Sequence, residues 1–203
     1  MFYVVIAATL LVGYLIGSIP TGYLIVKKKK GIDIRTIGSG STGATNVSRV
    51  LGKKWFFIVM VLDMLKGFLP VFAVSYLWGN EWNVVAMVVG LVVGHSRTCF
   101  LKGKGGKSVA IGLGILFALN WMAGLIVFLV WALIVQVGKY VSVGSIAAFV
   151  MAPVLLWLCG APMSYVWCGV FMGVYIVFRH RENIRRLLNH QENRFSWTNQ
   201  KEN

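Results

Sequence analysis

Two glycine-rich segments carry the residue types that bind phosphate. The first is Gly38-Ser-Gly-Ser-Thr-Gly-Ala-Thr-Asn46, and the second is Lys102-Gly-Lys-Gly-Gly-Lys-Ser108. Glycines let the backbone approach an anion, hydroxyls donate hydrogen bonds, and a helix that begins near Ala44 would point free N–H groups at it. The lysines of the second segment add movable positive charge. Both segments therefore predict anion sites, although a flexible polar loop and a signal for membrane topology are the plainer alternatives.

Neither segment has the full pattern of a nucleotide-binding loop. Gly38, Gly40 and Gly43 match the spacing of a dinucleotide fingerprint, but no preceding strand or βαβ unit is expected. The second segment ends like the phosphate loop of nucleotide hydrolases, but Leu101 stands where its first glycine is required. The sequence also lacks a nucleophile elbow, the HxxxxD acyltransferase signature and metal-ligand spacing. We therefore expect no nucleotide hydrolysis, no metal, no cofactor and no covalent enzyme intermediate.

Two further segments bring polar groups toward the same face. Ser142 and Ser145 lie one turn apart at a predicted helix entry, where capping is the plainer interpretation. Residues 179–194 are strongly basic and include His180 and Asn183, although this segment could also be an amphipathic helix on anionic lipid. Together with the glycine-rich loops, the two segments suit more than one phosphate group.

Asp63 and Lys66 are charged residues within an apolar stretch. Three positions apart on a helix, they share a face and can neutralise each other. Charge is costly inside a membrane, so such residues are candidates for a function, and pairing and cavity lining remain equally open. His95 follows another apolar run, where packing is the commoner role of a lone histidine.

The composition indicates a membrane protein. Of the 203 residues, 58% are hydrophobic and 13% are charged, and the mean hydropathy is +0.75, which excludes a soluble globular domain. The 20 Lys and Arg against 6 Asp and Glu would otherwise favour nucleic acid as a partner, but the apolar runs argue against it. Three cysteines without paired spacing predict no disulfide framework.

Seven apolar stretches come close to the roughly 20 residues that a membrane crossing needs. They cover residues 2–26, 55–78, 83–100, 108–119, 121–137, 140–158 and 163–178. Seven crossings with the N-terminus outside put nineteen of the twenty Lys and Arg on the cytoplasmic face, with Lys66 inside a span. Five crossings are the alternative if neighbouring stretches merge. The sequence thus predicts an all-α, polytopic transmembrane helix bundle, a single domain over 1–203 with a basic cytoplasmic segment at 179–203.

The stretch 108–119 is short for a membrane span. As a helix it would extend about 18 Å, against a hydrocarbon core of about 30 Å. Irregular backbone at membrane depth survives only where protein buries it or where it lines a wet cavity. The preceding loop, residues 95–107, is therefore expected to line a polar pocket that opens to the cytoplasm.

Seven motifs occur in a fixed order along nearly the whole chain. They are Gly17–Tyr23, Gly38–Asn46, Leu62–Gly67, Gly94-His95, Lys104–Ala110, Tyr140–Ser142 and Arg179–Ile184. In this set the chain resembles the bacterial acyl-phosphate-dependent glycerol-3-phosphate acyltransferases. The resemblance implies a multi-pass plasma-membrane enzyme, surrounded by membrane lipids, with its active site facing the cytoplasm. It would transfer a fatty acyl group from acyl phosphate to the sn-1 hydroxyl of glycerol 3-phosphate, the first step of phospholipid synthesis, giving lysophosphatidic acid and phosphate. A soluble enzyme that makes acyl phosphate would be a partner.

The resemblance also assigns residues to the two substrates. Acyl phosphate would be held by Ser39, Gly40, Ser41, Gly43, Thr45, Asn46, Lys104, Gly105 and Gly106. Glycerol 3-phosphate would be held by Arg49, Lys107, Ser142, Ser145, His180 and Asn183, of which Arg49, Lys107 and His180 would also serve catalysis. The chain departs from the family at Ser41, where asparagine is usual, and at Arg97-Thr98, where an aromatic residue and proline are usual.

Acyl phosphate carries a good leaving group, so the enzyme mainly needs to hold both substrates and neutralise developing charge. We expect direct attack by the glycerol hydroxyl, whose proton passes to the departing phosphate or, as the alternative, to His180. A transporter of an organic phosphate would also need basic loops and a polar cavity, but the sequence halves show no inverted repeat and the outer face has no basic residue. A membrane scaffold would leave the glycine-rich loops unexplained.

Overall fold

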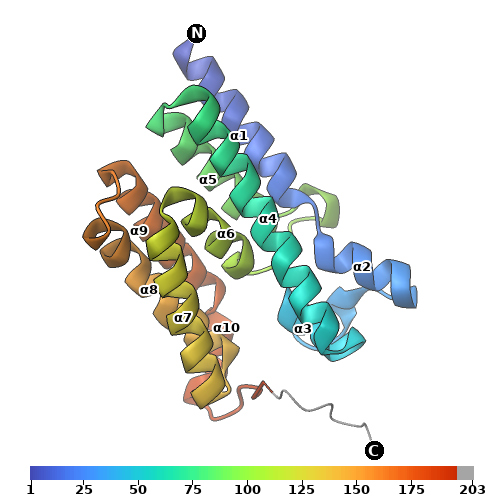
Figure 1. The fold of residues 1–203 in the computed structure, drawn as a ribbon. Helices are drawn as coiled ribbons and strands as arrows, with labels where there is room; N and C mark the ends of the chain where they lie inside the picture. Colours follow the sequence, from blue (N-terminus) through green and yellow to red (C-terminus); the bar gives the residue numbers. More distant parts are fainter. Residues whose placement is uncertain (196–203) are drawn as a thin grey trace, which may run out of the picture.

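The computed structural model describes residues 1–195, and residues 196–203 of the basic C-terminal segment lie outside the described part. Seven apolar helices form the bundle in Figure 1: α1 (Phe2–Ser18), α4 (Lys53–Trp78), α5 (Glu81–Ser96), α6 (Val109–Leu119), α7 (Trp121–Gly138), α8 (Val141–Leu158) and α9 (Met163–Arg179). Shorter helices are α2 (Thr21–Lys30), α3 (Ala44–Leu51) and α10 (Arg181–Leu188). The predicted all-α bundle is confirmed.

Five helical segments of residues 1–195 are long and apolar enough to cross a membrane. They are Phe2–Lys30, Lys53–Trp78, Glu81–Leu101, Trp121–Gly138 and Val141–Leu158. The apolar helices α6 and α9 are shorter, with 11 and 17 residues. Asn120 separates α6 from α7, because its side-chain oxygen accepts the backbone N–H of Ala123 and so caps the start of α7.

The first predicted span, 2–26, lies within the candidate span Phe2–Lys30, but two helices form it instead of one. α1 ends at Ser18, and α2 starts at Thr21 in a different direction (Figure 1). Pro20 lacks an N–H and disfavours helical geometry at the preceding Ile19, whose ψ is 112°. The third predicted span, 83–100, lies within the candidate span Glu81–Leu101, in which α5 itself ends at Ser96 and a short 3₁₀ helix follows at Cys99–Leu101.

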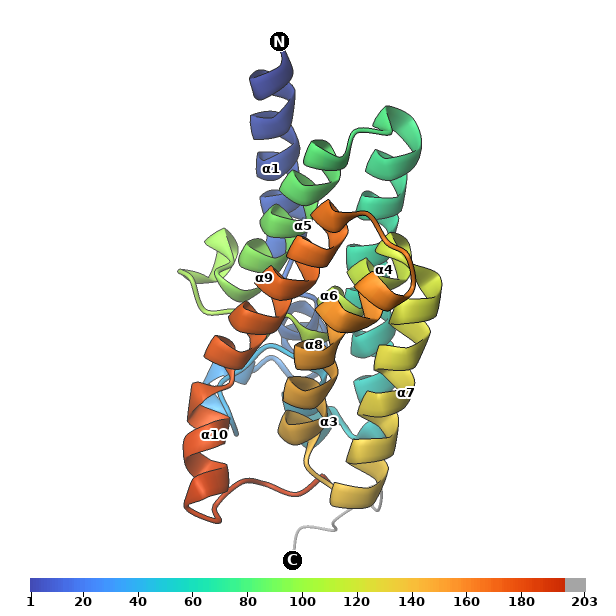
Figure 2. The same cartoon turned by 90° about the vertical axis from the view of Figure 1, so that its left-hand side faces the viewer.

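Small residues let α1 and α5 pack backbone against backbone. Each helix carries a Gly-x-x-x-Gly pattern, with Gly13 and Gly17 on α1 and Gly90 and Gly94 on α5. A Cβ atom on Gly94 would collide with the carbonyl oxygen of Tyr14, and one on Gly17 would collide with the backbone of α5. This close approach, visible in Figure 2, is typical of helix pairs in membranes. The hydrophobic effect does not drive helices together within lipid, and small residues allow close van der Waals packing instead.

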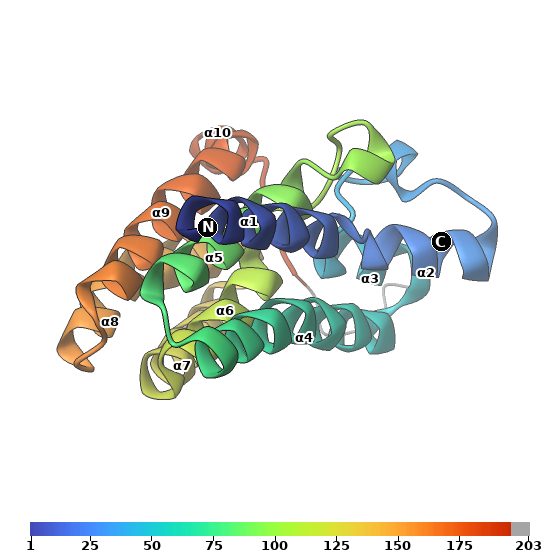
Figure 3. The ribbon, with the colours of Figure 1, turned by 90° about the horizontal axis from the view of Figure 1, so that it is seen from above.

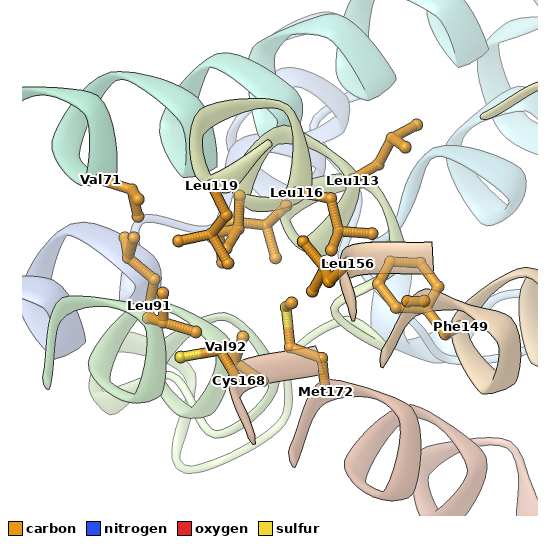
Figure 4. Packing of buried hydrophobic residues seen from close by; sticks show 14 of the residues in the cluster. Val71, Leu91, Val92, Leu113, Leu116, Leu119, Phe149, Leu156, Cys168 and Met172 are labelled. Carbon is orange, nitrogen blue, oxygen red and sulfur yellow. The ribbon is translucent and has the colours of Figure 1, made fainter. Parts of the chain in front are cut away.

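The helix α6 lies at the centre of the bundle. Seen from above in Figure 3, α5 crosses beneath α1, and α6 lies between α1 and α4. Ile111, Ile115 and Leu116 of α6 are fully buried. Figure 4 shows side chains of α6 packed among residues of α4, α5, α8 and α9, including Val71, Leu91, Val92, Phe149, Leu156 and Met172. Because protein surrounds α6, a helix of 11 residues can lie within the bundle without exposing its ends to lipid.

The polar segments gather at one end of the bundle. Figure 2 shows α3 and α10 at the end opposite the N-terminus, and Figure 1 shows α2 on the same side. The ends of α4, α7 and α9 that carry Lys53, Lys139 and Arg179 also lie there. The fold therefore brings the basic segments together.

Candidate active site

A cavity of about 800 Å³ lies where the polar segments meet the helix bundle. Its polar lining comes from the loop before α3, from α3, from the loop before α6, from the first turns of α8, and from α10 with the segment after it. Its apolar lining comes from inside the bundle and includes Phe56, Met60, Leu113, Val127, Trp131, Ala148 and Phe149. A cavity with one polar and one apolar lining fits a molecule that has an anionic group and a long hydrocarbon chain.

All six residues that were expected to hold glycerol 3-phosphate line this cavity. They are Arg49 of α3, Lys107 of the loop before α6, Ser142 and Ser145 of α8, His180 between α9 and α10, and Asn183 of α10. Four segments that are far apart in the sequence supply them. Their convergence is a finding of the structure, and their contact with a substrate stays a prediction.

Lys107 is the central cation of the cavity. Its Nζ donates a hydrogen bond to Oδ1 of Asn183 at 2.5 Å. Burial, together with the positive charges of Arg186 and Arg49, lowers the pKa of Lys107 to about 8, although Glu192 acts in the opposite direction. The lysine is therefore charged at neutral pH but close to its titration range, and an added anion would stabilise its charged form.

Glu192 is a residue that the sequence reasoning missed. Its carboxylate accepts hydrogen bonds from Ser142 Oγ at 2.9 Å, Asn183 Nδ2 at 2.6 Å and Arg186 Nε at 2.8 Å. Burial opposes its ionisation, but the hydrogen bonds from Asn183, Arg186 and Ser142 outweigh burial and hold its pKa below the usual value. The sequence feature that could have pointed to Glu192 is an acidic residue within a strongly basic segment. The carboxylate links α8 to α10 and fixes two of the expected binding residues.

His180 is buried and uncharged at neutral pH. Burial and the charge of Lys107 lower its pKa to about 4, although a hydrogen bond to the backbone of Ile176 acts in the opposite direction. Its Nδ1 lies 2.8 Å from the carbonyl oxygen of Ile176. A carbonyl only accepts, so Nδ1 carries the hydrogen and Nε2 is left as an acceptor. The ring can thus accept a hydrogen bond from a hydroxyl in the cavity.

The first glycine-rich loop is held in shape by Asn46. Its Oδ1 accepts the N–H of Ser39 at 3.1 Å, and its Nδ2 donates to the carbonyls of Ile37 at 3.0 Å and Ser41 at 2.9 Å. A Cβ on Gly38 would collide with Oδ1 of Asn46, and φ of Gly38 is +59°, so a larger residue is excluded there. The helix that follows begins at Ala44, as predicted. The Asn46 amide thus shapes the loop, and the phosphate contact that was expected of it stays a prediction.

A second cavity, of about 710 Å³, adjoins the first on the other side of this loop. The two cavities share Ser39, Ser41, Lys107 and Arg186. The residues expected to hold acyl phosphate divide between them: Gly43, Thr45 and Asn46 line the first, whereas Gly40, Lys104 and Gly105 line the second. Gly106 lines neither, because it packs against the imidazole of His95. The residues expected to surround the donor phosphate therefore line two adjoining cavities, and Ser39 and Ser41 line both.

Asp63 and Lys66 pair, and Asp63 also lines the first cavity, whereas Lys66 lines neither cavity. Nζ of Lys66 lies 3.0 Å from Oδ1 of Asp63 and 3.2 Å from Nδ1 of His95. Asp63 and His95 are lining residues of the first cavity. The predicted pairing on one face of α4 is confirmed, and His95 has a polar partner in addition to its packing role.

Comparison with known proteins identifies the family. Residues 7–190 match the family model described as glycerol-3-phosphate acyltransferase. The glycerol-3-phosphate acyltransferase of Synechococcus sp. (strain JA-3-3Ab) is 48% identical over 176 residues, which cover 87% of this chain and 86% of that protein. The corresponding enzyme of Aquifex aeolicus (strain VF5) is 44% identical over 183 residues, which cover 90% and 95% of the two chains.

Two crystal structures of PlsY, an integral membrane glycerol 3-phosphate acyltransferase, have the same fold. The glycerol 3-phosphate form superposes with a TM-score of 0.90 at 41% identity and covers 94% of this chain and 96% of that chain. The lysophosphatidic acid form superposes with a TM-score of 0.87 at the same identity and covers 94% and 95%. The resemblance found in the sequence is thereby confirmed, and the chain belongs to the family of integral membrane glycerol-3-phosphate acyltransferases.

Proposed function

We propose that this acyltransferase takes its acyl group from acyl phosphate and transfers it to the sn-1 hydroxyl of glycerol 3-phosphate. The observation that carries the proposal is the first cavity, in which the cations Arg49, Lys107 and Arg186 adjoin an apolar lining. An acyl phosphate and a glycerol phosphate together bring two anionic groups and one hydrocarbon chain. The two basic cavities and the apolar lining match that combination of groups.

Glycerol 3-phosphate binds with its phosphate between Arg49 and Lys107. Charge-assisted hydrogen bonds to a dianion are stronger than neutral ones, and both cations line the same cavity. Ser142, Ser145 and Asn183 lie around them as hydroxyl and amide donors. The bound forms of the related PlsY structures, with glycerol 3-phosphate in one and lysophosphatidic acid in the other, support a site that holds this substrate and its acylated product.

The phosphate of the acyl donor binds at the junction of the two cavities, against Ser39, Ser41 and the first turn of α3. Ser39 and Ser41 line both cavities, and Gly43 and Thr45 line the first, so the loop and the helix N-terminus present N–H and hydroxyl groups to an anion. Lys104 and Gly105 approach the same junction from the second cavity. The acyl chain lies along the apolar lining inside the bundle.

The reaction is a direct acyl transfer. The glycerol oxygen forms a bond to the acyl carbon, the bond from that carbon to the phosphate oxygen breaks, and phosphate leaves with the electron pair. The departing phosphate takes the hydroxyl proton and leaves as hydrogen phosphate, because the electron pair of the broken bond makes it a much stronger base than His180, whose pKa is about 4. His180 accepts a hydrogen bond and orients the hydroxyl. Lys107 and the loop amides stabilise the developing charge.

The enzyme crosses the membrane seven times, with the N-terminus outside and the active site facing the cytoplasm. The gathering of α2, α3 and α10 at one end of the bundle supports this topology, since those segments carry many of the basic residues. In a variant without native cysteines, a cysteine in place of Asn80 should react with an impermeant reagent from outside intact cells, and one in place of Asn189 should not. The reverse labelling would refute the orientation.

Phosphate release tests the choice of donor. Purified enzyme is given palmitoyl phosphate with and without glycerol 3-phosphate, and the assay is repeated with palmitoyl-CoA. We expect release that depends on glycerol 3-phosphate, and no lysophosphatidic acid from palmitoyl-CoA. Lysophosphatidic acid formed from palmitoyl-CoA at a similar rate would refute acyl phosphate as the specific donor.

A further inference from the structure

The buried charges of α4 form a cluster that the proposed reaction does not use. Nζ of Lys66 lies 3.0 Å from Oδ1 of Asp63, 3.2 Å from Nδ1 of His95 and 2.8 Å from the carbonyl oxygen of Ile19. The contacts with His95 and Ile19 are hydrogen bonds, whereas the contact with Asp63 is an ion pair whose buried Oδ1 has no hydrogen-bond partner among the described residues. Because Lys66 donates to Nδ1, the hydrogen of the His95 ring is on Nε2. The cluster ties together the break after α1, the middle of α4 and the end of α5.

The ring of His95 lies directly beneath the lysine-containing loop. A Cβ atom on Gly106 would collide with Nε2 of His95. The backbone N–H of Gly106 donates to the carbonyl oxygen of His95 at 3.1 Å, and that of Gly105 donates to the carbonyl of Ser96 at the same distance. The imidazole thus contacts the loop directly, and the last turn of α5 anchors it.

The residues on both sides of Lys107 are attached to the same turn of α5. Gly106 is held as described, and the hydroxyl of Ser108 donates to the carbonyl oxygen of Val92 at 2.8 Å. Arg179 holds Gly106 from the opposite side, since its Nη2 donates to the Gly106 carbonyl at 3.1 Å. The side chain of Lys107 therefore leaves the backbone at a point that the end of α5 determines.

We propose that Asp63, Lys66 and His95 are positioning residues that set the location of Lys107 for the glycerol phosphate. This inference rests on the proposed role of Lys107. Lys66 fixes the orientation of the His95 ring, the ring supports Gly106, and Gly106 carries Lys107 into the cavity. Charged groups inside a membrane protein carry a large desolvation cost, so their use here suits a site that needs accurate geometry.

A double-mutant cycle tests this coupling. His95→Asn keeps an acceptor for Lys66 close to Nδ1 but removes the part of the ring that supports Gly106. The dissociation constant of glycerol 3-phosphate is measured by calorimetry for the wild type, His95→Asn, Lys107→Ala and the double variant. We expect His95→Asn to weaken binding ~10-fold when Lys107 is present and less than ~2-fold when it is absent. Equal losses in the two backgrounds would overturn the inference, because His95 would then act independently of Lys107.

A steric test uses the contact between His95 and Gly106. Gly106→Ala places a methyl group where the ring lies, so kcat/KM should fall ~10-fold or more. His95→Asn vacates that space, and the double variant should therefore have a higher kcat/KM than Gly106→Ala alone. A double variant that is as poor as the product of the two single losses would refute the proposed contact.

A third comparison examines the charged end of the cluster. Lys66→Met should lower kcat/KM for glycerol 3-phosphate ~10-fold, whereas Lys66→Arg should restore most of it because it keeps the charge and the donors. Lys54→Met is the matched control, an exposed lysine of the same helix, and should be unchanged. Lys66→Met with wild-type kinetics would overturn the inference. Lys107→Ala with wild-type glycerol 3-phosphate binding would instead overturn the proposed phosphate site.

Discussion

Lys107 and Asn183 join the loop before α6 to α10 through a hydrogen bond of 2.5 Å across the cavity. The amide of Asn183 also donates to Glu192 at 2.6 Å, so one side chain connects a cation and an anion. The amide of Asn183 therefore bridges the lysine and the carboxylate.

Asn183→Asp should be more harmful than Asn183→Ala. The new carboxylate would lie within hydrogen-bond distance of Glu192 and would add negative charge beside a phosphate site, so we expect KM for glycerol 3-phosphate to rise ~10-fold or more. Steady-state kinetics at saturating acyl donor provide the measurement. Asn189→Asp, at the exposed end of the same helix, is the control. An aspartate variant with the affinity of the alanine variant would contradict the assigned geometry.

Binding of glycerol 3-phosphate should weaken as the pH rises through about 8, because the charged form of Lys107 binds the anion and is lost above that pKa. At low pH the limit is the substrate, whose second ionisation lies near pKa 6. KM measured between about pH 6 and 9 should therefore pass through a minimum. Lys107→Arg should move the alkaline limb to higher pH, since arginine stays protonated. If the alkaline limb of the KM profile stays at the same pH in Lys107→Arg, a group other than Lys107 is responsible for it.

Arg49→Ala should raise KM for glycerol 3-phosphate ~10-fold to 100-fold, the effect of losing a hydrogen bond between charged groups. KM for the acyl donor should change much less, because the donor phosphate is assigned to the loop before α3 and its first turn, whereas Arg49 lies in the last turn of α3. The KM values for glycerol 3-phosphate and for the acyl donor are measured in the same set of steady-state titrations. Arg185→Ala removes an exposed arginine of α10 and serves as the control. Equal increases in the two constants would contradict the assignment of Arg49 to glycerol 3-phosphate.

Glu192→Ala should lower both stability and activity. The change removes the acceptor of Ser142, Asn183 and Arg186, and unsatisfied buried polar groups cost about 1–3 kcal/mol. We expect a lower midpoint of thermal unfolding in detergent and a higher KM for glycerol 3-phosphate. Glu192→Gln keeps one acceptor oxygen and should fall between the alanine variant and the wild type. An alanine variant with unchanged stability would mean that Glu192 does not hold α8 to α10.

Val127→Trp should shorten the acyl chain that the enzyme accepts. Val127 of α7 is 1% exposed and lines the apolar part of the cavity, so a larger side chain there fills space that the hydrocarbon would occupy. Rates with palmitoyl phosphate and decanoyl phosphate give the comparison, and the ratio should shift toward decanoyl. Leu129→Trp, on the exposed surface of α7, is the control. A lower rate with both donors by the same factor would place the chain elsewhere.

Much of the fold could be predicted because apolar length and charge placement act locally. Each predicted stretch contains one apolar helix, and Asn120 marks the division between α6 and α7 as expected. The break at Pro20 was not predicted, because hydropathy alone does not show where a helix changes direction. The geometry of proline explains the break. The central position of α6 was not predicted, because it depends on packing between helices that are far apart in the sequence.

The six residues expected at the glycerol phosphate converge on one cavity, and each lies in one of the motifs or, as Arg49 and Ser145 do, three residues after one. The residues expected to hold the acyl donor were harder to place. The loop before α3 lies between two cavities, and these residues are divided between the two cavities. Glu192 could not be singled out by type, because the basic segment also contains Glu182 and Glu202, and carboxylates in such a segment usually pair at the surface. Its hydrogen bonds depend on how α10 folds back toward α8.

The site draws on residues from almost the whole length of the chain, from Ser39 to Glu192. During synthesis the N-terminal helices therefore emerge and pack long before the anion site can exist. Until the segment that contains Glu192 has been translated and has folded back onto α8, Ser142 and Asn183 have no common acceptor. The polar lining of the cavity is therefore completed only after the ribosome has passed Glu192, with the folding of the last segments that line it.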